Sequence, residues 1–399
     1  MARVFCDLGK APLANALVDG ADRNAAEESL PLLVHVCDRC LLVQLEAFET
    51  PERLFSNYVY FSSFSETWLA HSRAYAYAIR NRLALGEHSL VVEVASNDGY
   101  LLQYFREQSI PVLGIEPAAN VAEEAVRRGV PTLVRFFGTA LADELRAQGR
   151  RADLLVGNNV LAHVPQLTDF VAGMARLLAD EGVITMEFPH LLRLMRETQF
   201  DTIYHEHLSY FSLTTVEKIF AARRLTIFDT EEISTHGGSL RIYACHARSA
   251  RAKPGPRVAA VKAAEHAARL DNVAGYSEFA ERARAVRQRL VDLLQEIRRS
   301  GKRIAAYGAP AKGNTLLNYC GIRSDTVEFT VDRSPHKQGK LLPGSHVPIY
   351  APEKIFEARP DYVLILPWNI KDEIITQMAG VRSWGGRFIV PIPNAEVVS

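Results

Sequence analysis

The sequence lacks the features that mark several large classes of protein. Its 46 lysines and arginines balance 46 aspartates and glutamates, so no net charge draws it to nucleic acid or to an anionic membrane. No apolar run is long enough to span a bilayer, and the first residues do not form a charged and then apolar secretion leader. The five cysteines, an odd number, form no disulfide framework. We therefore expect a cytoplasmic protein, and 399 residues predict two or three domains.

The sequence also lacks the Gly-x-Gly-x-x-Gly pattern of a dinucleotide fold. Residues 89–95 predict a buried parallel strand that leads through a tight turn, 96–99, into a helix, and a second strand, 111–115, ends at Glu116. This order is typical of a Rossmann-type cofactor half. The turn is polar and follows Glu93, which disfavours a pyrophosphate and suits a cationic cofactor without phosphate, such as S-adenosylmethionine. The candidate cofactor residues are Glu93, Ala95, Asn97, Gly99, Glu116, Asn158 and Asn159.

Further strands are predicted at 152–157 and 182–188, and a last pair, 225–228 and 238–243, is expected to add an antiparallel edge. In an open parallel sheet, ligands lie beyond the carboxyl ends of the strands. Two candidate cofactor asparagines and His163 follow the first of these strands. We therefore expect them to share one crevice with the polar turn.

The densest group of reactive side chains is the stretch 204–210, which holds two tyrosines, two histidines and a glutamate. Such groups remove protons, orient a base or donate to an oxyanion. His205 and His207 do not fit one helix face, so a His-x-x-x-His metal helix is excluded. In an extended segment these two histidines would share a face, whereas in a turn Tyr204 and His207 would converge. A polar loop with half-buried aromatic residues is the alternative without a function.

A second α/β unit is predicted after two helices in 254–300. A small-residue turn, 308–315, contains Lys312 and resembles a phosphate cradle, but it lacks the order of a P-loop. A structural turn and an anion site therefore both stay open. The loop 334–340, with Lys337, could add positive charge to the same pocket. This unit is expected to hold a phosphorylated ligand.

The N-terminal region contains one Cys-x-x-Cys pair, Cys37 and Cys40, which is half of a zinc ribbon. A structural zinc needs four ligands, and Cys6 and His35 are the other candidates. A small β module without metal is the alternative. Tyr58 lies in a stretch of tyrosine and serine that predicts a lid or a packed connector.

Five ordered motifs together carry a resemblance. They are Glu93-Val-Ala-Ser-Asn-Asp-Gly-Tyr-Leu-Leu, Asn158-Asn-Val-Leu-Ala-His-Val, Tyr204-His-Glu-His-Leu-Ser-Tyr-Phe, His236-Gly-Gly-Ser-Leu-Arg and Ala306-Tyr-Gly-Ala-Pro-Ala-Lys-Gly-Asn-Thr. The chain resembles the S-adenosylmethionine-dependent C-methyltransferases that modify TDP-4-keto-deoxysugars in antibiotic pathways. The resemblance implies a zinc-binding N-terminal domain (1–65), a central Rossmann-like methyltransferase domain (66–250) and a second Rossmann-like α/β domain that shares in sugar-nucleotide binding (251–399). Members usually carry two Cys-x-x-Cys pairs, and this sequence begins after the position of the first.

The resemblance also implies the chemistry, methyl transfer to a carbon next to the ketone, with C3 as the expected position. The implied active-site residues are Tyr58, His163, Tyr204, Glu206 and His207. We expect His207 to remove the proton, and tyrosine hydroxyls to stabilise the enolate. The candidate substrate-binding residues are His236, Lys312, Asn314, Lys337, Trp368 and Asn369.

Three other functions compete with this prediction. An O- or N-methyltransferase would need no carbon acid. An oxidoreductase or epimerase would use the C-terminal unit with a nicotinamide cofactor, but the glycine spacing there does not fit one. A binding protein without catalysis would not need the reactive cluster at 204–207.

Overall fold

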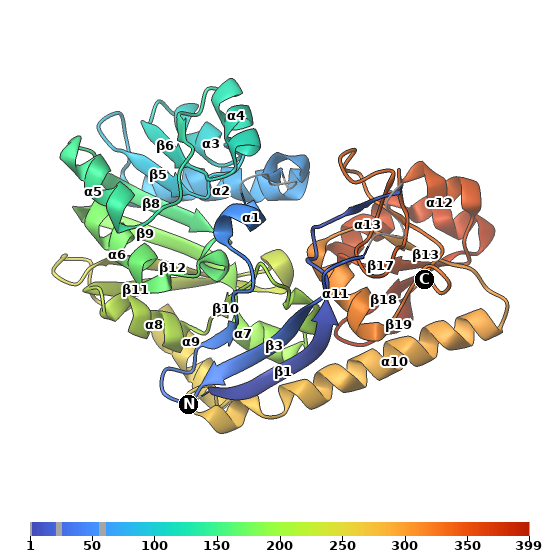
Figure 1. The fold of residues 1–399 in the computed structure, drawn as a ribbon. Coiled ribbons are helices and arrows are strands. Elements are labelled where there is room, and N and C mark those ends of the chain that lie inside the picture. The colour runs from blue at the N-terminus through green and yellow to red at the C-terminus, as the bar shows by residue number, and fades with distance from the viewer. Residues whose placement is uncertain (1, 21–25, 56–60, 399) are drawn as a thin grey trace.

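Three sheets organise the protein. The structure is a computed structural model that describes residues 2–20, 26–55 and 61–398. A seven-stranded central sheet and a six-stranded C-terminal sheet form the two large bodies in Figure 1, and a four-stranded N-terminal sheet lies at the base between them. The predicted α/β class, with a Rossmann-like central sheet and a second α/β unit, is confirmed. None of the described helices is both long and apolar enough to cross a membrane.

The central sheet has the strand order β11-β12-β9-β8-β5-β6-β7. Five strands are parallel, while β12 runs antiparallel to both β9 and β11, as predicted for the sheet edge. The chain order reverses between β5 and β8, and at such a switch point the carboxyl ends open a crevice. The strands are β5 (Val91–Val94), β6 (Val112–Ile115), β7 (Thr132–Leu133), β8 (Ala152–Asn158), β9 (Leu178–Pro189), β11 (Leu225–Ile233) and β12 (Ser239–His246).

Amphipathic helices accompany this sheet, and each buries its apolar residues in the core. The longest, α2 (Glu66–Leu83), begins where the Ser65 side chain accepts a hydrogen bond from the backbone N–H of Trp68, which is a helix cap. The others are α3 (Leu102–Arg106), α4 (Ala119–Arg127), α5 (Thr139–Ala147), α6 (Leu167–Leu177), α7 (Leu191–Arg196), α8 (Leu213–Ala221) and α9 (Pro256–Ala267).

The C-terminal sheet has the order β16-β14-β13-β17-β18-β19, with only β19 antiparallel among these strands. One predicted boundary here is wrong: the helix expected to begin near residue 316 begins at Ala311. Pro310 has an extended conformation that suits a helix start, and Gly313 lets the first turn approach Leu366 closely. Lys312 and Asn314 therefore lie on a helix rather than in a loop. The elements are β13 (Ile304–Tyr307), α11 (Ala311–Cys320), β14 (Thr330–Val331), β16 (Ile349–Tyr350), α12 (Glu353–Ala358), β17 (Tyr362–Ile365), α13 (Lys371–Gln377), β18 (Arg387–Val390) and β19 (Glu396–Val398).

The N-terminal region forms long strands where the sequence pattern seemed irregular. β1 (Ala2–Ala11), β3 (Leu30–Cys37), β4 (Val43–Leu45) and β10 (Ser209–Tyr210) make one antiparallel sheet. Its last strand comes from the reactive stretch, and β2 (Val18–Asp19) pairs with β15 (Lys340–Leu341) of the C-terminal region. Phe5 of β1 stacks on Phe279 of α10 (Phe279–Arg299), with ring centroids 4.5 Å apart. Because strands pair across the limits at residues 65 and 250, the domain boundaries 1–65, 66–250 and 251–399 stay predictions.

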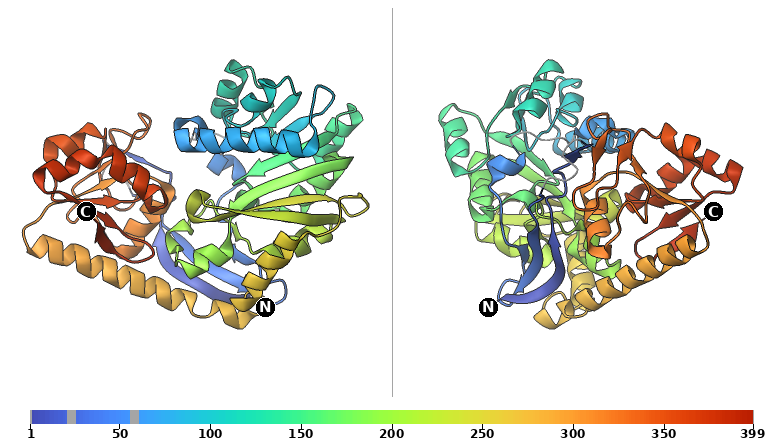
Figure 2. Two further views of the ribbon diagram at one scale, coloured as in Figure 1. Left: turned by 180° about the vertical axis from the view of Figure 1, so that it is seen from behind. Right: turned by 45° about the vertical axis from the view of Figure 1, so that its right-hand side comes forward.

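The helix α10 connects the central and C-terminal units along the base of the molecule (Figure 1, Figure 2). It buries six side chains on one face, four of them at the spacing 283, 286, 290 and 294, and leaves charged residues outside. The predicted long helix with a solvated charged face is therefore confirmed.

Glu265 of α9 connects its helix to the start of α8 and to His190 inside the core. Its carboxylate is fully buried and accepts hydrogen bonds from the backbone N–H groups of Leu213 and Thr214 at the start of α8 and from Nε2 of His190. Burial alone would raise the pKa of Glu265, but these hydrogen bonds hold it below the ordinary value. Glu265→Ala should lower the free energy of unfolding by about 3–5 kcal/mol, because a buried imidazole and two N–H groups lose their partner.

Urea-induced unfolding measures this effect. Lys262→Ala is the matched control, since Lys262 lies on the same helix and pairs with Glu217 at the surface, where an ion pair contributes less than about 1 kcal/mol. Equal free energies of unfolding of the two variants would show that the buried contacts of Glu265 do not stabilise the fold.

Candidate active site

One cavity of about 1300 Å³ lies between the central and C-terminal units. Its walls come from the ends of β5 and β8, from α2, from the 200–210 segment that leads into β10, from the start of α11, and from Asn15 in the N-terminal region. The cavity is therefore large enough to hold two ligands side by side, and it lies at the switch point where a parallel sheet binds them.

The polar turn after β5 forms the first part of this cavity. Ala95, Asn97 and Gly99 all have left-handed backbone conformations, with φ of 56°, 49° and 77°. A side chain at position 99 would also meet Val130 at 2.9 Å, so glycine is required there. This conformation turns the chain sharply at the end of the strand, and the side chain of Asn97 lies in the cavity wall.

Glu116, at the end of β6, holds the turn in place from the other side. Its two oxygens accept hydrogen bonds from the backbone N–H groups of Asn97 and Ala118, each at 2.9 Å. Burial raises the pKa of Glu116 to about 7, while the two N–H groups oppose the shift. The carboxyl group lines the cavity and retains lone pairs, which suits a ligand with neighbouring hydroxyls, as on a ribose.

Some of the other predicted cofactor residues line the cavity, and some do not. Ala95, Asn158 and Asn159 line the cavity, and Nδ2 of Asn158 donates to the Tyr100 hydroxyl at 3.4 Å. Glu93 and Gly99 do not line it. Glu93 is fully buried, and burial raises its pKa well above the ordinary value despite an interaction with Tyr100. Glu93 therefore lies behind the wall, and the polar character of the site comes from the residues in front of it.

Tyr204 and His207 meet in a turn, which resolves the alternative that the sequence left open. The backbone N–H of His207 donates to the Tyr204 carbonyl, and the Tyr204 hydroxyl lies 2.7 Å from Nε2 of His207. Nδ1 of His207 lies 2.9 Å from the carbonyl oxygen of Thr202. A carbonyl only accepts, so Nδ1 carries the proton and Nε2 is the basic nitrogen.

Burial keeps the imidazoles of His163 and His207 neutral. Burial lowers the pKa of His163 to about 4, and Nδ1 of His163 donates to the Glu206 carbonyl at 2.7 Å. Burial, followed by the neighbouring His163, also lowers the pKa of His207 well below its ordinary value. The two rings contact each other edge to face, with centroids 4.8 Å apart. Near neutral pH both rings therefore carry their lone pair on Nε2, and in His207 that lone pair accepts from the Tyr204 hydroxyl.

Glu206 faces away from the cavity, and a residue that the sequence did not single out connects it to the site. Its Oε1 accepts a hydrogen bond of 2.7 Å from Nδ2 of Asn15, and Asn15 lines the cavity. His205 also points away, since its Nε2 donates to the Leu30 carbonyl at the N-terminal sheet. An isolated asparagine in an irregular stretch gives no signal in the sequence. Tyr58 lies outside the described residues.

The predicted substrate residues divide into two groups. His236, Lys312, Lys337 and Asn369 line the cavity, whereas Asn314 and Trp368 lie behind its wall. Nζ of Lys337 donates to the Ala309 carbonyl at 2.9 Å, so this lysine supports the loop it belongs to.

The exposed Arg333, which we did not predict, also lines the cavity, and no ion-pair partner of it is found in the described part of the chain. Arg333 therefore adds positive charge at the C-terminal side of the cavity.

Contacts of α11 and of Trp368, which follows β17, with the 200–210 segment join the two units. Trp368 donates its indole N–H to Asp201 at 2.6 Å, and the Thr315 hydroxyl donates to the Ile203 carbonyl at 3.0 Å. Burial raises the pKa of Asp201 to about 6, against the effect of Lys312. The C-terminal unit therefore contacts the segment that carries the reactive pair.

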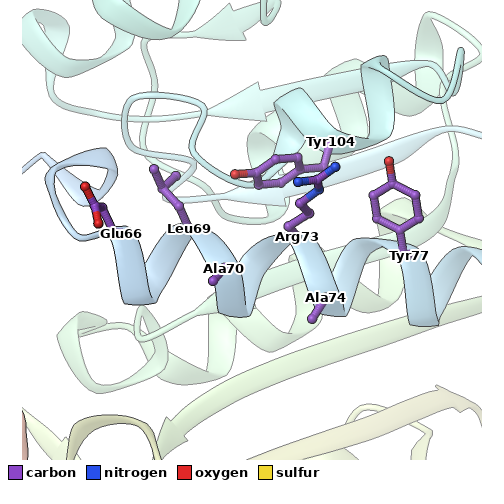
Figure 3. A pocket seen from close by; sticks show the side chains of 7 residues that line it. All are labelled: Glu66, Leu69, Ala70, Arg73, Ala74, Tyr77 and Tyr104. Atoms are coloured by element: carbon purple, nitrogen blue, oxygen red, sulfur yellow. The ribbon is translucent and has the colours of Figure 1, made fainter. Parts of the chain in front are cut away.

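A second hollow lies on the outer face of α2 and differs in kind. Figure 3 shows Glu66, Leu69 and Tyr77 on the helix and Tyr104 above it, with Arg73 between them. This groove is open and shares no lining residue with the cavity, and it contains neither histidine nor cysteine. It is separate from the cofactor turn and from the Tyr204–His207 pair, so we place no catalytic step there.

The comparisons with known proteins cover almost the whole chain. Three family models match it: "Putative zinc binding domain" at 2–55, "Methyltransferase domain" at 68–229 and "C-methyltransferase C-terminal domain" at 234–393. The C-methyltransferase NovU of Streptomyces niveus is 38% identical over 98% of this chain and 93% of its own length.

Two solved structures each match a little less than half of this chain. One is magnesium protoporphyrin IX methyltransferase of Synechocystis PCC 6803 with bound S-adenosylmethionine, with 17% identity, a TM-score of 0.34, and coverage of 45% of this chain and 78% of that one. Another is a SAM-dependent methyltransferase of Thermotoga maritima, with 14% identity, a TM-score of 0.35, and coverage of 46% and 95%.

The N-terminal region does not present a complete zinc site. Cys37 and Cys40 close the turn between β3 and β4, where the backbone N–H of Leu41 donates to the Cys37 carbonyl. Burial raises the pKa of the Cys6 thiol on β1 to about 12. Within residues 2–20, 26–55 and 61–398, no group of three or more potential ligands is arranged to hold a metal. The two thiols supply half of the four ligands that structural zinc needs, so we assign no role to a metal.

The position of Glu116 yields a prediction for cofactor binding. Glu116→Ala should weaken S-adenosylmethionine binding about 10- to 100-fold, because one charge-assisted hydrogen bond contributes roughly 1.5–3 kcal/mol. Isothermal titration calorimetry measures the Kd. Glu123→Ala on the exposed face of α4 should leave it unchanged. An unaltered Kd in Glu116→Ala would remove Glu116 from the cofactor site.

Proposed function

The chain belongs to the S-adenosylmethionine-dependent C-methyltransferases, and from this premise we propose that it methylates a TDP-4-keto-deoxysugar at C3, next to the ketone. The observation that carries the proposal is the Tyr204–His207 pair, a neutral base in the same cavity as the cofactor turn. A carbon next to a ketone must lose a proton before it attacks a methyl group, whereas an oxygen or amine nucleophile would not need a base aimed at carbon.

The bound cofactor supplies an electrophilic sulfonium methyl group. On the side of the chain, Glu116 accepts hydrogen bonds from hydroxyls of the cofactor, and Asn158 and Asn159 offer amide groups at the end of β8. Because these residues and the Tyr204–His207 pair line one cavity, both reactants are held in orientation and water is displaced.

His207 is the proposed base, and Tyr204 connects it to the substrate. Nδ1 donates to the Thr202 carbonyl, so the lone pair is on Nε2, where the Tyr204 hydroxyl donates to it. When the C–H bond breaks, the Tyr204 oxygen takes that proton while its own proton passes to Nε2. The electron pair of the C–H bond moves to the ketone and leaves an enolate. Its carbon would take the methyl group of a bound S-adenosylmethionine, and the S–CH3 electron pair would stay on the sulfur of the S-adenosylhomocysteine that leaves.

The neighbours of the pair have supporting roles in this proposal. His163 contacts the ring of His207 and presents its own unprotonated nitrogen beside it. Asn15 fixes Glu206 and, through it, the turn that holds His207. The exposed guanidinium of Arg333 suits the negative diphosphate of a sugar nucleotide, and the cavity volume admits such a ligand together with the cofactor.

Isotope exchange tests the proposed reaction. We expect the wild-type protein to exchange the hydrogen next to the ketone of a TDP-4-keto-6-deoxysugar in heavy water, and to add one methylene mass when S-adenosylmethionine is present. His207→Asn and Tyr204→Phe should each slow both processes by about 10²–10⁴, the contribution of general acid–base catalysis. Mass spectrometry detects both signals.

His205→Asn is the matched control for this experiment. His205 precedes Glu206 in the same stretch, but its ring donates to the Leu30 carbonyl, a role that asparagine can also fill. This variant should retain turnover. Methyl transfer without exchange, to an oxygen or nitrogen, would refute carbon methylation, and full activity of His207→Asn would refute the assignment of the base.

The pH dependence gives an independent prediction. His207 acts in its neutral form, and its pKa is lowered by burial, His163, His236 and Lys312, so the neutral form persists to more acidic pH than for a free histidine. At saturating cofactor, kcat/KM for the sugar should fall only below pH 6.5, the ordinary histidine value. A loss of activity that begins above this pH would contradict a neutral His207 in the free enzyme.

A further inference from the structure

Lys312 occupies a place that differs from the one its motif suggested. The sequence pattern left a structural turn and an anion site open, but this residue lies on the first turn of α11, and it lines the same cavity as Tyr204 and His207. Nζ donates to Oδ1 of Asn369 at 2.6 Å and lies 4.7 Å from the ring centre of Trp368. Because the Asn369 amide is neutral, it orients the amine of Lys312 without cancelling its positive charge.

The surroundings give this amine a neutral hydrogen-bond acceptor, Asn369, but leave its positive charge without an ion pair in the described part of the chain. Among the described residues no carboxylate lies within ion-pair distance of Lys312, although Asp201 is near enough to act on it. The other carboxylates of the region are engaged: Glu187 binds Arg241 at 2.8 Å, and Asp332 accepts from the backbone N–H of Ala309. An amine with hydrogens to spare in a buried site is suited to a negative charge that develops there.

The pKa shifts of the groups near Lys312 agree with this role. Lys312 lowers the pKa of both His207 and His236 in addition to burial, and the pKa of His236 is about 4. Burial also lowers the pKa of Lys312 itself, and Asp201 opposes this shift. Positive charge on Lys312 therefore acts on the base, and this residue lines the same cavity as the Tyr204–His207 pair.

We propose that Lys312 is a catalytic residue that donates a hydrogen bond to the ketone oxygen of the substrate and stabilises the enolate. The inference rests on the proposed function, because it needs a ketone next to the methylated carbon. The step is balanced: the proton leaves carbon for the Tyr204–His207 pair, the electron pair moves to oxygen, and the N–H bonds of Lys312 stay intact. Asn369 is then a positioning residue, and the phosphate of the substrate lies elsewhere.

Hydrogen exchange next to the ketone tests the proposal without methyl transfer. The wild-type protein and Lys312→Met are incubated with a TDP-4-keto-6-deoxysugar and S-adenosylhomocysteine in heavy water. Exchange and, with S-adenosylmethionine, methyl transfer should both slow by about 10²–10³ in the variant, as when one oxyanion donor is removed. The Kd for S-adenosylmethionine should not change, and Lys312→Arg should restore part of the rate. Lys354→Met, at an exposed lysine of α12, is the control.

A second variant tests the proposal if Lys312→Met does not fold. Asn369→Asp keeps the shape but places a carboxylate beside the amine, and the ion pair should slow exchange by at least the tenfold that about 1.4 kcal/mol represents. If a folded Lys312→Met or Asn369→Asp exchanges at the wild-type rate, the role of Lys312 is refuted while the proposed function still holds. A wild-type protein that neither exchanges nor methylates would instead refute the proposed function.

Discussion

The rest of the structure depends on how the 200–210 segment is fixed from three sides. β10 pairs with β4 of the N-terminal sheet, and the Leu208 N–H donates to the Ala162 carbonyl in the central unit. From the C-terminal unit, Trp368 donates to Asp201. In the proposed reaction this turn presents a tyrosine and a histidine to one substrate carbon, and such a role would need this constraint, because an error of one ångström in position costs a large part of the rate. The three sheets are thus parts of one site.

The sequence predicted most of the fold because its signals are local. The buried run 89–95, the polar turn and the acid at Glu116 are continuous in the chain, and the structure places them as expected. The convergence of Tyr204 and His207 could be stated only as one of two alternatives, since the choice between a turn and an extended strand depends on packing. Asn15 could not be found, because its contact with Glu206 is distant in sequence, whereas Arg333 directly precedes the basic loop 334–340 that the sequence did indicate.

The same reasoning explains why Lys312 and Lys337 were read alike from the sequence and differ in the structure. Both belong to stretches rich in glycine and proline before or after short strands, and both are positively charged. The helix begins five residues earlier than its apolar pattern suggested, so Lys312 lies on its first turn, while Lys337 donates to the Ala309 carbonyl and lies 3.7 Å from Asp332. Helix boundaries are the least certain part of any pattern-based prediction, and here a single boundary changes a role.

Burial gives the cavity its chemistry. Three imidazoles, those of His163, His207 and His236, are held neutral by a surrounding of low polarity, so a base is available without a nearby carboxylate to activate it. A base with so low a pKa is weak, and it can act only if the product anion is stabilised strongly in the same place. The low dielectric that weakens His207 also strengthens a hydrogen bond to an enolate oxygen. The depressed basicity and the buried amine of Lys312 are therefore two consequences of one environment, and each would be of little use without the other.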